Sequence, residues 1–192
     1  MSRRRGAELD TAIRTAVLEL LAEHGPTGVT MDAVAAVART SKPVLYRRWP
    51  DRRALLRDTL LGTATASIPS PDTGSFRGDM LAVLRAWAAL FTGEGAALMR
   101  SVVIAVAADP ELAATFRTDV IGMRKEEMNA ILARAVGRGE VRADVPVALV
   151  RELGQSVLWH RLLISGDPIT DEVVTELVDE VLIPVTRPYY ET

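Results

Sequence analysis

The chain has 192 residues and a formal net charge of −2, and 48 % of its residues are hydrophobic and 25 % charged. This composition indicates a folded protein of one domain or two small domains and argues against intrinsic disorder. The absence of cysteine excludes disulfide bonds, cysteine-ligated zinc or iron–sulfur centres, and catalysis by a thiol.

The charge is unevenly distributed along the chain. Residues 1–57 contain 11 Lys and Arg against 6 Asp and Glu, whereas residues 58–192 contain 12 against 19. The N-terminal segment therefore carries a charge of +5 and the remainder −7. A basic segment favours an anionic partner such as nucleic acid, although a solvated surface gives the same count.

No segment predicts a membrane span. The longest apolar run, Val102 to Ala108, has seven residues, far fewer than the roughly 18 that a spanning helix needs. The basic stretch Arg3–Arg5 is not followed by the apolar region of a signal peptide, because Glu8 and Asp10 interrupt it. We therefore expect a cytoplasmic protein without a membrane partner.

Helical periodicity begins at the first predicted element. Apolar residues recur at intervals of three and four from Leu9 to Leu21, and Gly25-Pro26 ends this helix. A second short helix is expected to begin at Thr30, whose hydroxyl can cap its first turn, with Asp32 favourable for the helix dipole.

A tight turn over residues 39–41 leads to a third predicted helix, residues 42–49. Ser41 is expected to cap this helix, and Pro43 is tolerated in its first turn. Pro50 ends it, and Asp51 is expected to cap a fourth helix that runs to residue 66.

A connector rich in turn-forming residues, 67–75, separates this segment from the rest of the chain. Five further helices are expected, with Pro110, Pro146, Pro168 and Pro184 at their starts or beyond their ends: residues 76–91, 95–108, 111–137, 146–165 and 170–183. No alternation typical of strands occurs. The sequence thus predicts an all-α fold of about nine helices, with a DNA-binding domain over 1–66 and a larger helical domain over 67–192.

The stretch from Thr30 to Leu56, TMDAVAAVARTSKPVLYRRWPDRRALL, has the layout of a helix-turn-helix motif. Small alanines allow its first two helices to cross closely, and Val44 and Leu45 can anchor the second helix. Lys42 and the arginines that follow supply donors for base edges and phosphates.

This stretch resembles the DNA-binding domain of the TetR/AcrR family of bacterial repressors. The family's pattern, Ser-Lys-x-x-Leu-Tyr-x-x-Phe/Trp followed by a Pro-containing turn, a basic residue and Leu-Leu, matches Ser41 to Leu56, and the match covers about residues 8–60. Arg39 and Pro43 stand where the family commonly has glycine. A left-handed backbone at Arg39 would cost about 1–2 kcal/mol, and Pro43 removes one N–H that could contact DNA.

The resemblance implies roles for individual residues. Residues at positions that commonly hold phosphates are Thr30, Tyr46, Arg48 and Arg52. Those at positions that face base edges are Ser41, Lys42, Pro43 and Val44, and Arg47 can serve either role. Trp49 is expected in the core rather than at DNA, and Arg3–Arg5 is either a minor-groove arm or a tail.

The resemblance further implies a homodimer that binds a palindromic double-stranded operator and is released by an unidentified small-molecule effector. Pocket candidates are the large or adaptable side chains Trp87, Phe91, Met99, Val103, Phe116, Met123, Trp159 and His160, with Arg85, Arg100, Arg124 and Glu127 as alternatives that supply charge. Dimer candidates on the last two long helices are Gly154, Val157, Leu158, Val174, Leu177, Val178 and Val181. Core packing is the alternative for both sets.

Two other classes of function were weighed. An enzyme is disfavoured because no phosphate-binding loop, metalloprotease motif or nucleophile elbow occurs, and we expect no catalytic residue, metal site or cofactor. A helical interaction protein without a DNA role leaves the basic N-terminal segment and the ordered pattern from Lys42 to Arg53 unexplained. A ligand-responsive transcriptional repressor accounts for both.

Overall fold

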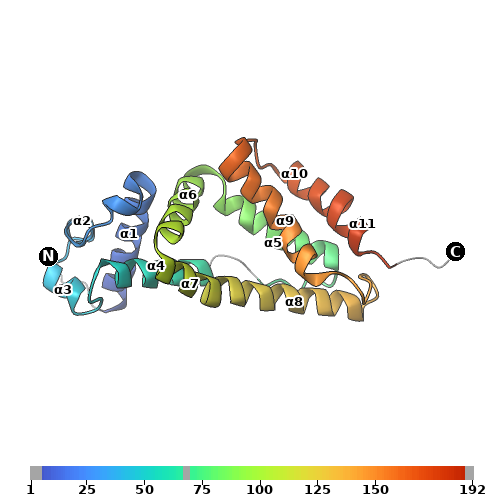
Figure 1. Cartoon of the computed structure of the whole chain (residues 1–192), viewed down its shortest axis with the longest axis horizontal. Helices are drawn as coiled ribbons and strands as arrows, with labels where there is room; N and C mark the ends of the chain where they lie inside the picture. Colours follow the sequence, from blue (N-terminus) through green and yellow to red (C-terminus); the bar gives the residue numbers. More distant parts are fainter. Residues whose placement is uncertain (1–5, 67–69, 189–192) are drawn as a thin grey trace. The chain divides into compact units, whose positions relative to one another are not determined.

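The computed structural model describes residues 6–66 and 70–188 and is helical throughout these ranges, without a strand (Figure 1). This confirms the predicted all-α class. Several elements continue directly into one another, so the described residues form nine continuous helices, as expected. The elements are α1 Ala7–Gly28, α2 Met31–Val37, α3 Lys42–Tyr46, α4 Arg52–Ala66, α5 Phe76–Leu90, α6 Gly93–Ala108, α7 Pro110–Thr115, η1 Phe116–Ile121, α8 Gly122–Gly137, α9 Val147–His160, η2 Arg161–Ser165, α10 Asp171–Glu176, η3 Leu177–Leu182 and α11 Ile183–Thr186.

The chain divides into two compact units, which we call the N-terminal and C-terminal units. The N-terminal unit contains the described residues of 1–65 together with 97–116, and the C-terminal unit contains those of 66–96 and 117–192. The expected boundary after residue 66 therefore separates α4 from α5, but the later segment 97–116 packs with the N-terminal helices. The division of function at residue 66 stays a prediction.

The N-terminal unit is built around one apolar core. Apolar side chains that recur every three or four residues on α1 pack against apolar side chains of α2, α3 and α4. Residues of α6 and α7 add further apolar groups to this core. The fully buried members include Ile13, Val17 and Leu21 of α1, Val34 of α2, Leu45 of α3 and Leu55 of α4. The later segment adds Val102, Ala105 and Leu112, which are buried but not completely.

The end of α1 shows why its sequence stops the first helix. Gly25 has φ 66° and ψ −174°, which no helix contains and which a residue with a side chain rarely adopts. Pro26 follows, and a last helical turn reaches Gly28 beyond this kink. The predicted interruption at Gly25 is therefore present, although helical backbone resumes after it.

The third helix is shorter than predicted. It ends at Tyr46, because the N–H groups of Arg48 and Trp49 both donate to the carbonyl of Leu45, at 2.9 Å, and tighten the chain into a turn. The Ser41 hydroxyl makes no capping hydrogen bond; its backbone carbonyl instead accepts from Val44 N–H at 2.9 Å. By contrast, the predicted cap at Asp51 is present, with its carboxylate 2.8 Å from Ala54 N.

The C-terminal unit packs α5 against α8, α9 and the helix that runs from α10 to α11 (Figure 1). Leu84, Leu158 and Leu182 fill its interior, and a Cβ at Gly154 would come within 3.1 Å of Leu84 and 3.4 Å of Leu182. Glycine at 154 therefore permits the close approach of α9 to its neighbours within one protomer.

Three of the long predicted helices contain π-helical segments that the sequence did not predict: η1, η2 and η3. Pro184 lies inside α11, directly after η3, and not beyond the end of the helix as expected. Local changes to π geometry are a known way for a helix to accommodate such irregularities.

Two bidentate ion pairs join α5 to the last helix. Arg77 Nε lies 2.6 Å from Asp179, and Arg85 Nε lies 2.6 Å from Asp171. Hydrogen bonds from these guanidinium groups hold the pKa of each aspartate below its ordinary value. The same contacts raise the pKa of both arginines, which stay charged throughout the accessible pH range.

These pairs predict a loss of stability in acid. Because the folded-state pKa of Asp171 and Asp179 is depressed, their contribution is complete above the unfolded-state pKa and disappears as pH falls through the lower folded value. Thermal unfolding between about pH 6 and pH 2 measures it. The double variant Asp171→Asn, Asp179→Asn should lose less stability over this range than the unmodified protein; equal losses would contradict the assignment.

Within residues 6–66 and 70–188, no single helix is long and apolar enough to cross a membrane. Only α5 and the Gly95–Ala108 part of α6 meet the requirements of length and hydropathy, and they do so only when taken together.

Candidate functional site

The first helix of the motif is fixed by its cap. Thr30 has extended backbone angles, and its hydroxyl accepts a hydrogen bond from Ala33 N at 3.1 Å. This is the predicted N-cap, and it leaves the Thr30 hydroxyl hydrogen available to donate to another group. Thr30 and Asp32 are both exposed at this end of α2.

The turn between α2 and α3 requires a left-handed residue. Arg39 has φ 53° and, within the described residues, is the one non-glycine with positive φ. Thr40 N then donates to Ala35 O at 2.9 Å, which closes the turn. Arg39 stands where the family commonly has glycine, and its backbone has the conformation that glycine favours.

Substituting Arg39 with glycine is therefore expected to stabilise the protein by about 1 kcal/mol, because the left-handed strain of a side chain disappears. The side chain of Arg39 is exposed, so little packing is lost. A rise in the thermal midpoint of the N-terminal unit checks this prediction, with Arg39→Ala as a control that keeps the Cβ and should give no comparable gain.

The second helix of the motif, α3, exposes most of its residues. Leu45 is fully buried and attaches the helix to the core, and Val44 is half-buried. Tyr46 is 51 % exposed although its side chain is large and mostly apolar. The other exposed residues of this surface are Ser41, Lys42, Pro43 and Arg47. We use the name α3 surface for the exposed or half-buried residues of this region: Thr30, Ser41, Lys42, Pro43, Val44, Tyr46 and Arg47.

Two cations near the α3 surface are held by carboxylates. Lys42 Nζ lies 2.5 Å from Asp32 of α2, and Arg48 Nε lies 2.7 Å from Asp10 of α1. The Lys42 pair is largely exposed, so its net contribution to stability is small. Asp32 therefore orients the Lys42 side chain but does not use all of its N–H donors. An exposed ammonium has three, so donors remain for a phosphate or a base edge.

Arg52 has a role that the sequence did not suggest. Its guanidinium donates to the carbonyl of Val29 at 2.5 Å and to the carbonyl of Pro26. Pro26 lies in the last turn of α1 and Val29 directly follows that helix, so both acceptors belong to the C-terminal end of α1, where the last carbonyls lack i+4 partners within the helix. Arg52 therefore positions the start of the motif, and the prediction that it also contacts a phosphate stays untested.

Arg53 binds the start of α7. Its Nε lies 2.7 Å from Asp109 and its Nη1 3.0 Å from Glu111, so the pair joins the first turn of α4 to a segment much later in the chain. In the sequence Arg53 belongs to the basic pattern that begins at Lys42, and no residue near it in the chain indicates a partner. The sequence separation is too large for pattern alone to have found this contact.

Trp49 is buried, at 7 % exposure, and its indole N–H donates to Asp58 at 3.0 Å. The same carboxylate accepts from Arg14 at 3.0 Å. This places Trp49 in the core, as the sequence analysis favoured. Arg3–Arg5, the other element left open there, lies outside the described residues.

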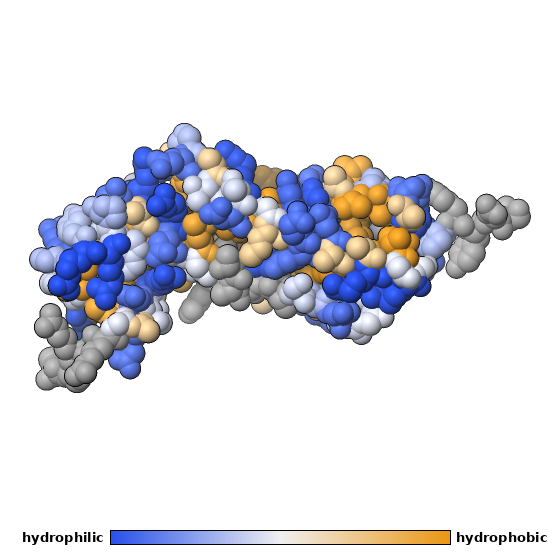
Figure 2. All heavy atoms as spheres, turned by 90° about the horizontal axis from the view of Figure 1, so that it is seen from below, coloured by the Kyte–Doolittle hydropathy of each residue, from blue (hydrophilic) through white to orange (hydrophobic). Residues whose placement is uncertain are grey.

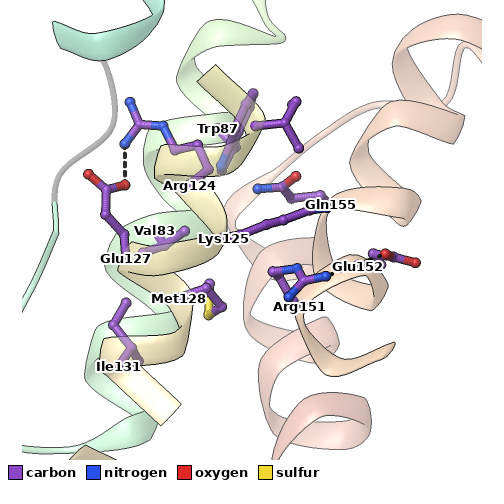
Figure 3. Close-up of a pocket in the computed structure, with 11 residues that line it drawn as sticks. Val83, Trp87, Arg124, Lys125, Glu127, Met128, Ile131, Arg151, Glu152 and Gln155 are labelled. Carbon is purple, nitrogen blue, oxygen red and sulfur yellow. Dashed lines mark hydrogen bonds and ion pairs between the residues drawn. The ribbon is translucent and has the colours of Figure 1, made fainter. Parts of the chain in front are cut away.

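The C-terminal unit contains a pocket of about 110 Å³ between α5, α8 and α9 (Figure 3). Its apolar wall consists of Val83, Met128 and Ile131 with the ring of Trp87. Its polar groups come from facing helices: Arg124, Lys125 and Glu127 on the α8 side, and Arg151, Glu152 and Gln155 on α9. Ile121 completes the lining.

Trp87 is the predicted pocket residue that lines this pocket. Phe91 and Trp159 pack on it instead, with ring centroids 5.4 and 6.2 Å from that of Trp87, and His160 is exposed. The remaining four predicted residues do not line it either: Met99 and Phe116 pack against the core of the N-terminal unit, and Val103 and Met123 are half-buried. The lining of this pocket combines an apolar wall with charged groups, among them Arg124 and Glu127, which the sequence offered as charged alternatives. The roles of the other predicted pocket residues stay a prediction.

Five of the predicted dimer residues are buried inside their own unit: Gly154, Leu158, Val174, Leu177 and Val178. We assign these to the core of the protomer, because a helix pattern does not distinguish an internal neighbour from a partner. Val157 and Val181 are half-buried. The exposed apolar residues of this region are Leu149, Leu163, Ile164 and Val185, and Figure 2 shows apolar residues at the surface of the C-terminal unit.

A capped short helix, a tight turn and a second helix with exposed donors define a helix-turn-helix DNA-binding protein. Comparison with known families agrees: residues 13–59 match the model of the tetR family of bacterial regulatory proteins, and residues 70–181 match the tetracyclin repressor-like C-terminal domain. The chain belongs to the TetR family of transcriptional regulators and is not an enzyme.

Individual relatives support this assignment over nearly the whole chain. The DNA-binding transcriptional repressor TetR of Mycobacteroides abscessus is 31 % identical over 185 residues, 96 % of this chain and 97 % of its own. The HTH-type regulator YdeS of Bacillus subtilis is 32 % identical over 87 % of this chain and 84 % of its own. The crystal structure of the TetR-family regulator SCO0332 is 32 % identical, with a TM-score of 0.70, and covers 94 % of this chain and 100 % of its own.

Proposed function

We propose that this regulator is a cytoplasmic homodimeric repressor that binds a palindromic operator and is released by a small molecule. The observation that carries the DNA-binding part is the α3 surface, where exposed donors surround a helix anchored by one buried leucine. The relative of 31 % identity is described as a repressor, which favours repression over activation. In this proposal residues 1–66 bind DNA, and residues 67–192 bind the effector and dimerise.

The proposed contacts divide by chemistry. Ser41, Lys42, Pro43 and Val44 would face base edges in the major groove, and Pro43 would contribute an apolar contact because it has no N–H. Thr30 and Tyr46 would donate hydroxyl hydrogens to phosphates, and Arg47 and Arg48 would supply charge. Arg52 would act on phosphates only with the donors that its carbonyl contacts leave free.

The proposed dimer uses the last two long helices of each protomer in a four-helix arrangement. Arg142 N donates to Thr186 O at 2.9 Å, which brings the end of α11 to the start of α9. Exposed Val185 and Leu149 therefore lie at the same end of this helix pair, and Leu163 and Ile164 lie beyond the other end of α9. Burial of these residues, with Val157 and Val181, against a second copy would remove apolar surface from water.

Release would pass along one continuous helix. The segment from α7 through η1 to α8 contributes both pocket residues and, at its start, the carboxylates that bind Arg53 of α4. A ligand that shifts α8 would then move α4 and change the separation of the two α3 helices. Successive major grooves lie about 34–36 Å apart, so a modest change prevents both half-sites from being occupied together.

A selection from a random DNA duplex pool tests this proposal. The recovered sites should be two-fold symmetric and bind two protomers, as measured by fluorescence anisotropy and analytical ultracentrifugation. Scrambling one half-site should remove most of the affinity, and affinity should fall steeply with salt because phosphate contacts release counterions. Asymmetric sites, one bound protomer or a salt-independent affinity would each contradict the proposal. Transcription in vitro from a promoter that carries the site separates repression from activation.

A further inference from the structure

The pocket of the C-terminal unit has an excess of hydrogen-bond donors over available acceptors. The indole Nε1 of Trp87 is buried and, within the described part of the chain, has no hydrogen-bond partner. A buried donor without a partner costs about 1–3 kcal/mol, so an acceptor that enters the pocket is favoured by this group. Trp87 and Val83, both on α5, line the pocket (Figure 3).

The charged groups of the pocket favour an anion. Its lining has three cations, Arg124, Lys125 and Arg151, against two carboxylates, which leaves one positive charge in excess. Arg124 is committed to Glu127, at 2.6 Å. Arg151, whose side chain is 18 % exposed, makes one long contact of 3.8 Å with Glu152 among the described residues, so most of its donors are not used in that pair.

The view of the pocket separates these two groups of charges. Arg124 and Glu127 point toward each other on one side of α8, whereas Lys125 extends toward α9, where Gln155 and Arg151 lie (Figure 3). The uncompensated positive charge therefore belongs to the side of the pocket between α8 and α9. The apolar residues Val83, Met128 and Ile131 lie along the α5 and α8 side.

The size of the pocket limits the ligand. An apolar cavity of about 150 Å³ holds one benzene molecule, and the volume here is about 110 Å³. The buried part of a ligand is thus no larger than one ring or a short branched chain. A multi-ring compound, for which pockets of about 300–1,000 Å³ are usual, would extend well beyond this pocket.

From these observations we infer that the pocket binds a small monocarboxylate with a compact apolar body. The body packs against the apolar wall, and the carboxylate accepts hydrogen bonds from the donors of Trp87, Lys125 and Arg151, which offsets the excess charge. The inference rests on the proposed function in one respect, namely that the C-terminal unit is the effector-binding part. It adds the chemical class of the effector.

Binding of benzoate to the full-length protein without DNA tests the inference, with benzamide as the neutral isostere and inorganic phosphate as an anion without an apolar body. Tryptophan fluorescence and isothermal calorimetry give the dissociation constants. Benzoate should bind more tightly than either control by about 10-fold or more, because benzamide loses the charge-assisted hydrogen bond and phosphate loses the contacts with the apolar wall. We expect a dissociation constant for benzoate of about 1 mM or below. Equal binding of benzamide, or no binding of benzoate at a concentration of about 10 mM, overturns the inference.

Variants locate the binding. Arg151→Gln and Trp87→Phe, which keep the approximate shapes of the side chains, should each weaken benzoate by about 10- to 100-fold. Arg187→Gln, which removes an exposed arginine of the same unit outside the pocket, should leave the affinity unchanged. Unaltered affinity in both pocket variants, with unchanged thermal unfolding, refutes the site.

The same proteins separate this inference from the proposed function. If benzoate binds in the expected way but does not change operator affinity, the pocket inference stands and release by this ligand class fails. If another compound releases the operator and the pocket variants respond to it as the unmodified protein does, the proposed function stands and the pocket inference fails.

Discussion

Replacing Lys42 with alanine is expected to weaken binding to the selected operator by about 10- to 100-fold, the range of one good contact to a base edge. Binding to a random duplex should change much less, so the substitution relaxes sequence preference. The fold should be unaffected, because the side chain is 49 % exposed and its pair with Asp32 is a surface pair. Anisotropy titrations on operator and random duplex, repeated at several salt concentrations, measure both effects.

A matched control removes the carboxylate instead of the ammonium. Asp32→Asn leaves Lys42 in place, frees its ammonium from the contact of 2.5 Å, and removes a negative charge next to the proposed DNA-binding surface. Its affinity for both duplexes should therefore rise, by a few-fold for a charge at this exposure. If Lys42→Ala and Asp32→Asn change affinity in the same direction, Lys42 does not contact the bases.

Replacing Leu45 with alanine is expected to cost about 2–5 kcal/mol of stability in the N-terminal unit, as is usual for a fully buried leucine. The five residues of α3 are too few to form a stable helix alone, so its position depends on this side chain. Operator binding should be lost together with the stability. Thermal unfolding by circular dichroism and hydrogen exchange of α3 amides measure the loss.

The neighbouring residue provides the control for this substitution. Val44 is only half-buried, so Val44→Ala should cost well under half the stability lost in Leu45→Ala. If Val44 contacts thymine methyl groups as proposed, its variant should lose operator affinity while the protein remains folded. A Leu45→Ala protein that unfolds at the same temperature as the unmodified protein would contradict the anchoring role.

Local signals in the sequence were sufficient for the helices of the motif. The caps at Thr30 and Asp51 and the breaks at Gly25 and in the turn at Arg39 all depend on residues adjacent in the chain, and each is present. Ser41 makes no side-chain cap, because Pro43 has no N–H to donate to its hydroxyl and Val44 N–H donates to the backbone carbonyl of Ser41 instead. Side-chain caps are optional where a backbone acceptor is already well placed.

The pocket could not be predicted in the same way. Phe91 and Trp159, two of the large apolar candidates, pack on each other with ring centroids 4.4 Å apart and do not line this pocket, so their part in effector binding stays a prediction. The residues around Arg151 in the chain do not indicate that it lines a pocket, because an arginine on a helix is ordinarily solvated. A pocket forms where packing between helices is incomplete, which depends on the shapes of all neighbouring side chains.

The sequence by itself determined the helical class, the helix-turn-helix and its basic surface, because periodicity, capping and charge act between residues close in the chain. The charge division of +5 and −7 places the basic share in the segment that contains the helix-turn-helix. The tertiary structure alone decided that Arg52 binds the carbonyls of Pro26 and Val29, that Arg53 binds Asp109 and Glu111, and which valines and leucines are internal. These contacts join residues distant in the sequence, and only the packing of whole helices brings them together.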